Sequence, residues 1–335
     1  MQHAGHSQRK QAGELFWLKS MAYQKKIPHG IMFHHFYNEA HPSGQGAISA
    51  DDLDNLLRYV GLERILPPFE WLKRLKENKL KNGDVCLTFD DALLCQTEIA
   101  LPVLEKHGFK AFWFIYSGVF EGKQENLELY RFFRVKYFDN IDDFYQIFFK
   151  KVSEAGIAAD TDPEFEKRML ESFPFYSIND IRFRFLRDKA LGRINYEKIM
   201  DAMLKDCGLD KKAMSKRLWM SDNDLKYLSG SGHVIGLHSY SHPTALADLS
   251  FEEQFSEYKK NYSHIKRVTG QNPVVAAHQV SSYNDDTLKI LEKLGIVCCF
   301  RSNMFPKKEG GALNASALEM AREDHANVMR MMKDR

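Results

Sequence analysis

Two adjacent carboxylates end an apolar run near residue 90, and such a pair can divide metal binding and proton transfer between its members. The run before them, residues 85–89, is too short for a helix, so we predict a buried strand with Asp90 and Asp91 at its carboxyl end. Catalytic groups of α/β folds and barrels are mounted at this end of a strand. Alternatively, Asp91 caps a helix that begins near Ala92, and Asp90 is merely solvated.

A second apolar run, residues 234–237, leads to His238, and His242 follows four residues later. Over one helical turn or a tight loop, this spacing lets both imidazoles face one point, as a divalent cation requires. Two histidines alone are weak evidence, because surface pairs at this spacing are common. Two histidines with one carboxylate form a ligand set that leaves metal positions open for water and substrate.

The ordered motifs Thr88–Asp91 and His238–His242 resemble the first two motifs of the polysaccharide deacetylase family, carbohydrate esterase family four. The flanking stretches 99–108 and 225–232 fit the same family, and the resemblance covers roughly residues 28–120 and 218–330. It implies an α/β fold, a distorted (β/α) barrel of the deacetylase type with a helical insertion. It also implies a hydrolase that acts on amide C–N bonds, a sugar N-deacetylase.

The resemblance implies a role for each of several residues. Asp91, His238 and His242 would bind one divalent metal, most plausibly Zn²⁺, with Co²⁺ or Ni²⁺ as alternatives. Asp90 would take a proton from water, and His325 or His34 would protonate the leaving amine. A packed or solvated side chain is the competing interpretation of His34, and a mobile terminal residue is that of His325.

The chain departs from the family at the third motif, Arg-x-Pro-Tyr, where it has residues 277–280, Ala-His-Gln-Val. The family arginine orients the catalytic aspartate, so we expect the pKa of Asp90 to be less controlled. Val280 can still offer a backbone N–H to an oxyanion. His278 is either a replacement polar group or a loop residue. Ala92 stands where relatives carry glycine, which restricts the backbone at that turn.

Composition narrows the class of protein further. The 335 residues carry 47 basic and 45 acidic side chains, which gives no argument for a nucleic-acid polymer or an anionic membrane as partner. Five cysteines, an odd number without framework spacing, indicate buried thiols in a reducing compartment. Residues 1–24 lack an apolar stretch of secretory length and no transmembrane segment follows, so we predict a cytoplasmic protein.

The order of predicted elements divides the chain into an N-terminal tail, 1–26, and a barrel made of 27–120 and 218–335. Between them, residues 121–217 have helical periodicity, and we predict an inserted cap over the cleft. Its Arg131, Arg134 or Arg184 can meet a phosphate, although surface charge over an aromatic core is the simpler interpretation of each. The end of the chain, from Ala317, is predicted to be helical.

These features predict metal-dependent hydrolysis of the N-acetyl, or other N-acyl, group of an amino sugar. A cytoplasmic location favours an N-acylated amino-sugar substrate that is nucleotide- or lipid-linked, on the way to a surface polysaccharide. The alternative is a catalytically impaired carbohydrate-binding relative that retains the metal site. The intact Asp90 counts against that alternative, because a binding protein has no use for a spare base.

Overall fold

The computed structural model describes residues 23, 25–157, 163–172, 177–307 and 309–334. The predicted tail, with the stretch searched for a secretory leader, falls almost entirely outside the described residues. The chain divides into two compact units. Residues 1–123 and 219–335 form unit 1, and residues 124–218 form unit 2. Within the described ranges, no helix combines the length and the apolar character that crossing a bilayer requires.

Unit 1 is built on a sheet of seven parallel strands in the order β6-β5-β4-β3-β2-β1-β7. The strands are β1 His29–Phe33, β2 Val85–Asp90, β3 Phe112–Ile115, β4 Val234–Leu237, β5 Val275–Ala277, β6 Cys298–Phe300 and β7 Arg322–Asp324. A parallel bridge between Phe300 and Met320, just before β7, links the two edges of the sheet. The sheet is therefore a nearly closed barrel, which confirms the predicted fold.

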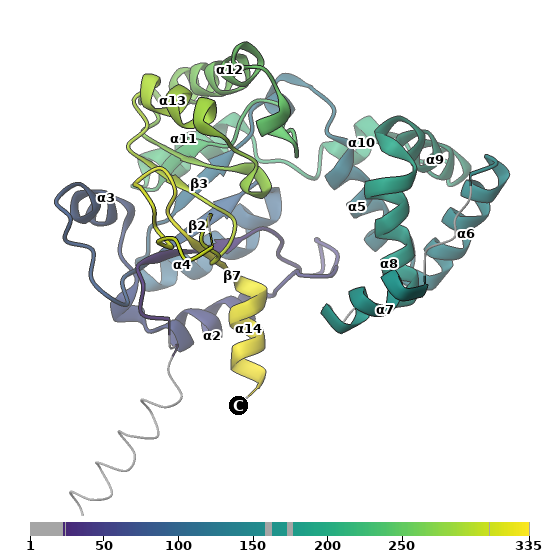
Figure 1. Cartoon of the computed structure of the whole chain (residues 1–335), viewed down its shortest axis with the longest axis horizontal. Helices are drawn as coiled ribbons and strands as arrows, with labels where there is room; N and C mark the ends of the chain where they lie inside the picture. Colours follow the sequence, from purple (N-terminus) through teal and green to yellow (C-terminus); the bar gives the residue numbers. More distant parts are fainter. Residues whose placement is uncertain (1–22, 24, 158–162, 173–176, 308, 335) are drawn as a thin grey trace, which may run out of the picture. The chain divides into compact units, whose positions relative to one another are not determined.

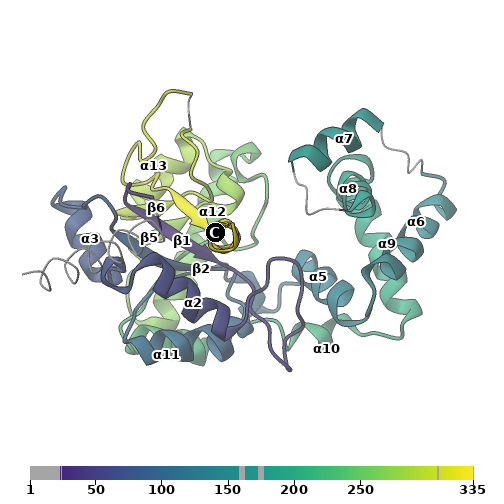
Figure 2. The same ribbon diagram turned by 90° about the horizontal axis from the view of Figure 1, so that it is seen from below.

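Helices cover the outside of the barrel, as Figures 1 and 2 show. They are α2 Ala50–Val60, α3 Pro68–Lys76, α4 Leu101–His107, α11 Asp222–Gly230, α12 Phe251–Thr269, α13 Asp285–Lys293 and α14 His325–Lys333. Helix α2 starts with a capping box at Ser49 and ends at Gly61. A π-helical turn, Gln96–Ala100, precedes α4.

Alternating side chains of the strands divide between two apolar clusters. One cluster joins the strands to the surrounding helices and includes Leu87 and Trp113. The other contains Phe112, Phe114 and Phe300 from the opposite strand faces, so it fills the interior of the barrel. Both faces of each strand are thus buried, as the continuous apolar runs of a parallel sheet indicate.

The prediction of a helical chain end from Ala317 is partly wrong. Residues 322–324 form β7, which pairs with β1, and the helix begins only at His325. A three-residue strand of sequence Arg-Glu-Asp has no apolar alternation to reveal it. Its only sequence signal is the N-cap at Asp324, whose side chain accepts a hydrogen bond from the backbone N–H of Ala326.

Unit 2 is helical and has its own aromatic core. Its helices are α5 Asn126–Lys136, α6 Ile141–Glu154, α7 Pro163–Ser172, α8 Ile178–Phe185, α9 Gly192–Asp206 and α10 Lys211–Ser215. The rings of Phe144, Phe148 and Phe183 contact one another, with centroids 5.0–5.8 Å apart. The guanidinium of Arg134 lies 4.9 Å from the Phe183 ring centroid. The placement of this unit over the cleft stays a prediction.

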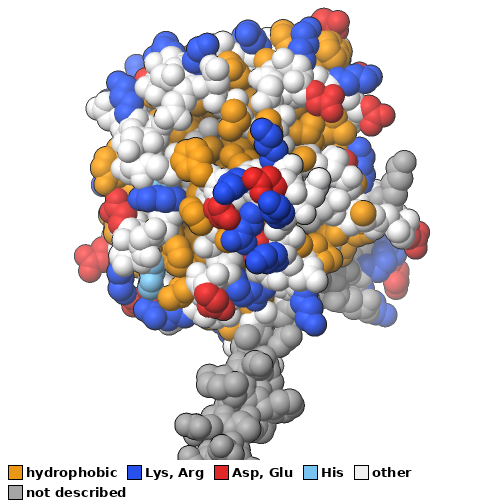
Figure 3. Space-filling view, turned by 90° about the vertical axis from the view of Figure 1, so that its left-hand side faces the viewer, with side chains coloured by type: hydrophobic (Ala, Val, Ile, Leu, Met, Phe, Trp, Pro, Cys, Tyr) orange, Lys and Arg blue, Asp and Glu red, His pale blue; other side chains and the backbone are white. Residues whose placement is uncertain are grey.

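Charged side chains of both signs mix on the surface around α3. Figure 3 looks onto this side of the molecule, where lysine and arginine side chains lie among carboxylates. Arg74 forms ion pairs with Glu70 and Asp84, at 2.7 and 3.0 Å. Basic and acidic side chains therefore lie side by side on this face, in keeping with the near balance of acidic and basic residues.

Candidate active site

The Asp pair lies at the carboxyl end of β2 and leads into a turn at residues 91–92, and helical structure begins only at Leu94. The backbone N–H of Asp91 still donates to the carbonyl of Phe114 on β3, at 3.0 Å. Asp91 and Ala92 then turn with φ of 78° and 55°, a left-handed conformation that strains any residue except glycine. The helix-cap interpretation of Asp91 is therefore wrong. Ala92 therefore adopts a left-handed conformation that a glycine would adopt without strain.

The two histidines come from the loop that follows β4. His238 lies directly after the strand, and His242 is reached through a tight loop rather than a helical turn. Ser239 and His242 both have positive φ, 66° and 54°. The hydroxyl of Ser239 accepts a hydrogen bond from the backbone N–H of His242 at 3.1 Å, which closes the loop on itself.

Helix α12 holds this loop through two polar side chains spaced four residues apart. The Asn261 side chain accepts the backbone N–H of His238 at 2.9 Å and donates to the Ile115 carbonyl at 3.0 Å. The Glu257 carboxylate accepts the backbone N–H groups of Tyr240 and Ser241, at 3.0 and 2.7 Å. The sequence analysis did not find these two residues. Their only signal is polar side chains four apart on a helix that otherwise packs on the core.

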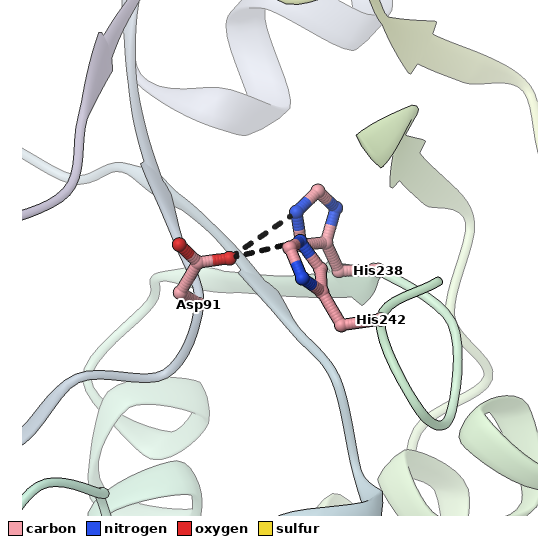
Figure 4. A group of neighbouring side chains, drawn as sticks. All are labelled: Asp91, His238 and His242. Carbon is pink, nitrogen blue, oxygen red and sulfur yellow. Dashed lines mark ion pairs between the residues drawn. The ribbon is translucent and has the colours of Figure 1, made fainter. Parts of the chain in front are cut away.

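Asp91, His238 and His242 converge on one point, as Figure 4 shows. One ligand atom from each lies within 4.8 Å of the others, and Oδ1 of Asp91 is 3.4 Å and 3.3 Å from the Nε2 atoms of His238 and His242. Burial lowers the pKa of His238, but Asp90 and Asp91 raise it more, so the net shift is upward. The carboxylates therefore create a negative potential in which a cation is stabilised.

The donor atoms of this set fit a divalent metal. Oδ1 of Asp91 is buried and has no hydrogen-bond partner among the described residues. Nδ1 of His238 lies 2.9 Å from the carbonyl of Ala277, so it carries the proton and donates it. That tautomer leaves the lone pair of Nε2 directed at Asp91, the arrangement found when a backbone carbonyl orients a metal-bound histidine.

Asp90 is held by an arginine that the sequence analysis missed. Arg322 of β7 donates from Nη1 to Oδ1 of Asp90 at 2.6 Å, and from Nη2 to Oδ2 at 2.7 Å. Burial raises the pKa of Asp90, but Arg322 and His238 outweigh this effect, so the pKa lies below its usual range. The expectation of a less controlled Asp90 is therefore wrong. The arginine is present, but it comes from another strand than in the family motif.

A glycine makes room for this arginine inside the barrel. Arg322 is fully buried, and its Nε donates to the carbonyl of Arg301 at 2.6 Å. A Cβ atom on Gly30 of β1 would lie 3.0 Å from Cγ of Arg322 and 3.1 Å from Cγ2 of Thr88. Gly30 therefore lets the arginine stem pass beside β1 without a clash.

The two histidines considered as proton donors lie in different environments. Nε2 of His34 is 3.8 Å from Asp90 Oδ2 and 3.9 Å from Asp91 Oδ2, and about a quarter of its side chain, 26%, is exposed. His325 is buried, which excludes the alternative of a mobile, exposed residue. Its ring nitrogens lie 3.2 and 2.9 Å from the carbonyls of Met32 and Gly46.

The segment that replaces the third family motif is short and strained. Val280 is well exposed, with φ 41° and ψ 28°. His278 is fully buried, stacks on Tyr283 at 4.0 Å, and places Nε2 3.0 Å from the carbonyl of Leu318. Burial lowers the pKa of His278 to about 3, so the ring is neutral. The suggested substrate and oxyanion roles of His278 and Val280 stay predictions.

Comparison with known proteins gives a family match over part of the chain. A family model described as polysaccharide deacetylase matches residues 209–299, a stretch that includes His238 and His242. The match confirms the resemblance to the polysaccharide deacetylases. Because deacetylation is a hydrolysis, it also supports the predicted enzyme class. No curated protein sequence matches the chain.

Solved structures of deacetylases share the fold at low sequence identity. The Streptococcus pyogenes deacetylase PplD in complex with acetate is 18% identical and has a TM-score of 0.53. The similarity covers 92% of this chain and 98% of that one. IcaB from Ammonifex degensii is 16% identical over 90% of this chain and 92% of its own, also with a TM-score of 0.53. At this identity the similarity establishes the deacetylase barrel.

Proposed function

We propose that this protein is a metal-dependent hydrolase that removes the N-acetyl, or another N-acyl, group from an amino sugar. One observation carries the proposal: three side chains that can bind a metal converge beside a second carboxylate, Asp90, which is not part of the ligand set. The buried Arg322 keeps Asp90 ionised and fixes both of its oxygens. Burying a carboxylate and a guanidinium inside a barrel costs desolvation free energy, even when they form a bidentate contact. A role of Asp90 in the reaction explains why the protein retains this pair.

The residues of the chain account for the proton transfers of such a hydrolysis. Asp91, His238 and His242 would hold a divalent ion, which would lower the pKa of water and polarise the acyl carbonyl. Asp90 accepts the proton of the attacking water, and the new C–O bond forms at the acyl carbon. The C–N bond then breaks, and the sugar nitrogen takes a proton. The products are a free amine and acetate, or formate if the acyl group is smaller.

His34 is the better placed donor of that last proton. Its Nε2 faces both carboxylates of the Asp pair, and its side chain reaches solvent. His325 contacts backbone carbonyls through both ring nitrogens and packs on Phe33, with ring centroids 5.6 Å apart. We therefore assign the general acid to His34, and a structural role to His325.

The substrate is proposed to be a nucleotide- or lipid-linked amino sugar in the cytoplasm, on the way to a surface polysaccharide. Four of the five cysteines, Cys86, Cys95, Cys298 and Cys299, are buried, which is compatible with a reducing compartment. That Arg131, Arg134 or Arg184 of unit 2 meets a phosphate stays a prediction.

The test combines metal content with acyl release. Elemental analysis of the wild-type protein should find about one divalent ion per chain, with Zn²⁺, Co²⁺ and Ni²⁺ distinguished by element. The His238→Ala/His242→Ala double variant should lose the ion and acetate release together. Asp90→Asn should keep the ion and lose turnover. His34→Gln should lower kcat, whereas His325→Gln should lower the melting temperature and spare kcat.

Two outcomes would contradict the proposal. Absence of any metal after reconstitution would exclude the ligand set and the reaction with it. Metal binding without acyl release from any N-acetylated sugar, together with an unchanged sugar affinity in Asp90→Asn, would favour the carbohydrate-binding alternative.

A further inference from the structure

The hydrogen bonds that Glu257 and Ser239 make with the histidine loop fix its backbone. Glu257 accepts the backbone N–H groups of Tyr240 and Ser241, and Ser239 accepts the backbone N–H of His242. These contacts leave the direction of the His242 imidazole to be set by its side-chain neighbours. A metal ligand works best when packing or hydrogen bonds hold its rotamer, so those neighbours bear on the metal site.

Tyr116, directly after β3, packs on this imidazole. The ring centroids of Tyr116 and His242 lie 4.9 Å apart, with an angle of 30° between the ring planes. Tyr116 is 1% exposed, so protein encloses its ring. The other ring in contact with His242 is that of His238, with centroids 5.0 Å apart, and the carbonyl of Ala277 fixes His238. Two aromatic contacts therefore restrict rotation of the His242 side chain.

The backbone on the carboxyl side of Tyr116 runs along the histidine loop. The N–H of Ser117 donates to the carbonyl of Ser239 at 3.3 Å, and the N–H of Gly118 donates to that of Tyr240 at 2.7 Å. A Cβ atom on Gly118 would lie 2.7 Å from the Tyr240 oxygen, so only glycine permits this approach. Tyr116 is thus held in a fixed register with the loop that carries His242.

Trp219 packs on Tyr116 in turn. Their rings meet edge to face, with centroids 5.5 Å apart and an interplanar angle of 72°. The backbone of Trp219 forms an antiparallel bridge with Leu93, and the N–H of Met220 donates to the carbonyl of Ala92 at 2.9 Å. Ala92 belongs to the strained turn that follows β2. One short segment therefore adjoins the turn of the carboxylate ligand and, through Tyr116, the ring of a histidine ligand.

We propose that Tyr116 is a positioning residue: its ring holds the His242 imidazole in the direction that metal binding requires, and Trp219 holds Tyr116 in place. The inference rests on the proposed function, because the metal-ligand set belongs to that function. Tyr116 is outside the ligand set and acts through His242. Residues that orient a metal ligand typically change metal affinity 10- to 100-fold when they are replaced, whereas a residue that only fills the core changes stability alone.

The experiment compares Tyr116→Leu and Tyr116→Phe with a control, Tyr145→Leu. Tyr145 is also 1% exposed, but its ring contacts Phe144 and Phe183 in unit 2. Zn²⁺ affinity is measured by titration calorimetry on protein stripped with a chelator. The NMR signals of the His242 ring, assigned with His242→Gln, are recorded without metal, because a neighbouring aromatic ring shifts them. Melting temperature shows whether each variant is folded.

Tyr116→Leu should weaken Zn²⁺ binding about tenfold or more and move the His242 signals toward those of a free imidazole. Tyr116→Phe keeps the ring and should restore both. Tyr145→Leu should lower the melting temperature and leave the Zn²⁺ affinity and the His242 signals unchanged. Trp219→Leu should weaken Zn²⁺ binding in the wild-type background but not further in Tyr116→Leu, because Trp219 acts through Tyr116.

The inference is overturned if Tyr116→Leu leaves the Zn²⁺ affinity and the His242 signals at wild-type values, or if Tyr145→Leu weakens Zn²⁺ binding as much. Trp219→Leu, at a half-buried position, decides the same question if Tyr116→Leu does not fold. If the wild-type protein binds no metal, the proposed function fails separately. The His242 signals of the metal-free variants still decide whether Tyr116 positions that ring.

Discussion

The contact between Arg322 and Asp90 should be strongly coupled, and a double-mutant cycle can measure the coupling. Asp90 is 1% exposed and accepts two hydrogen bonds from the guanidinium, at 2.6 and 2.7 Å. Arg322→Met keeps an apolar stem inside the barrel and leaves the carboxylate buried without its cation. Breaking a buried pair in this way costs about 3–5 kcal/mol.

Replacing both charges should cost much less than the sum of the single replacements. In Asp90→Asn/Arg322→Met no buried charge is left unpaired, so we expect a coupling free energy of about 3 kcal/mol. The assay is urea unfolding of the wild-type protein, both single variants and the double variant. A chelator in every sample removes the contribution of metal binding.

Arg64 provides the matched control. Its guanidinium is half-buried and donates to the carbonyls of Gly83 and Lys25 at 2.8 and 2.7 Å, away from Asp90. Arg64→Met and Asp90→Asn should therefore add within about 0.5 kcal/mol. If Arg322→Met and Asp90→Asn are additive to the same degree, the assignment of Arg322 as the partner of Asp90 is refuted.

Two further predictions concern the loop that carries the histidines and the amino end of the barrel. Glu257→Ala should weaken Zn²⁺ binding about 10- to 100-fold in titration calorimetry, because the Glu257 carboxylate holds the backbone of the loop that carries the histidines. Glu252→Ala, at an exposed position of the same helix, should leave the affinity unchanged. Equal Zn²⁺ affinities of the two variants would contradict a role of Glu257 in positioning the loop. Burial lowers the pKa of His29 from 6.5 to about 4, so its contribution to stability is full above pH 6.5 and is lost as the pH falls toward 4. Between pH 7 and pH 5, the loss of stability measured by urea unfolding should be about 2 kcal/mol smaller in His29→Asn than in the wild-type protein. An equally steep loss in the variant would exclude a contribution from His29.

The sequence predicts the barrel well because its signals are local. Short apolar runs that end in polar residues mark β2 and β4, and a capping box marks the start of α2. The candidate metal-ligand set could also be predicted from the sequence, because Asp91, His238 and His242 each follow a strand. Parallel strands bring their carboxyl ends to one edge, so residues far apart in sequence must meet there.

The residues that the sequence analysis did not find contact the site only through the tertiary structure. Arg322 lies 232 positions from Asp90, on a strand too short to have a pattern. Asn261 and Glu257 look like ordinary polar residues of a helix until the loop after His238 is placed against them.

The position of Arg322 limits which other sequences this barrel can accept. Ala277 stands where relatives carry the arginine of the third motif, and it faces the same interior in which Arg322 lies over the ring of Phe114, 5.7 Å from its centroid. Restoring arginine at position 277 would place two like charges and two long side chains in one crowded layer. The two locations of the arginine are therefore mutually exclusive.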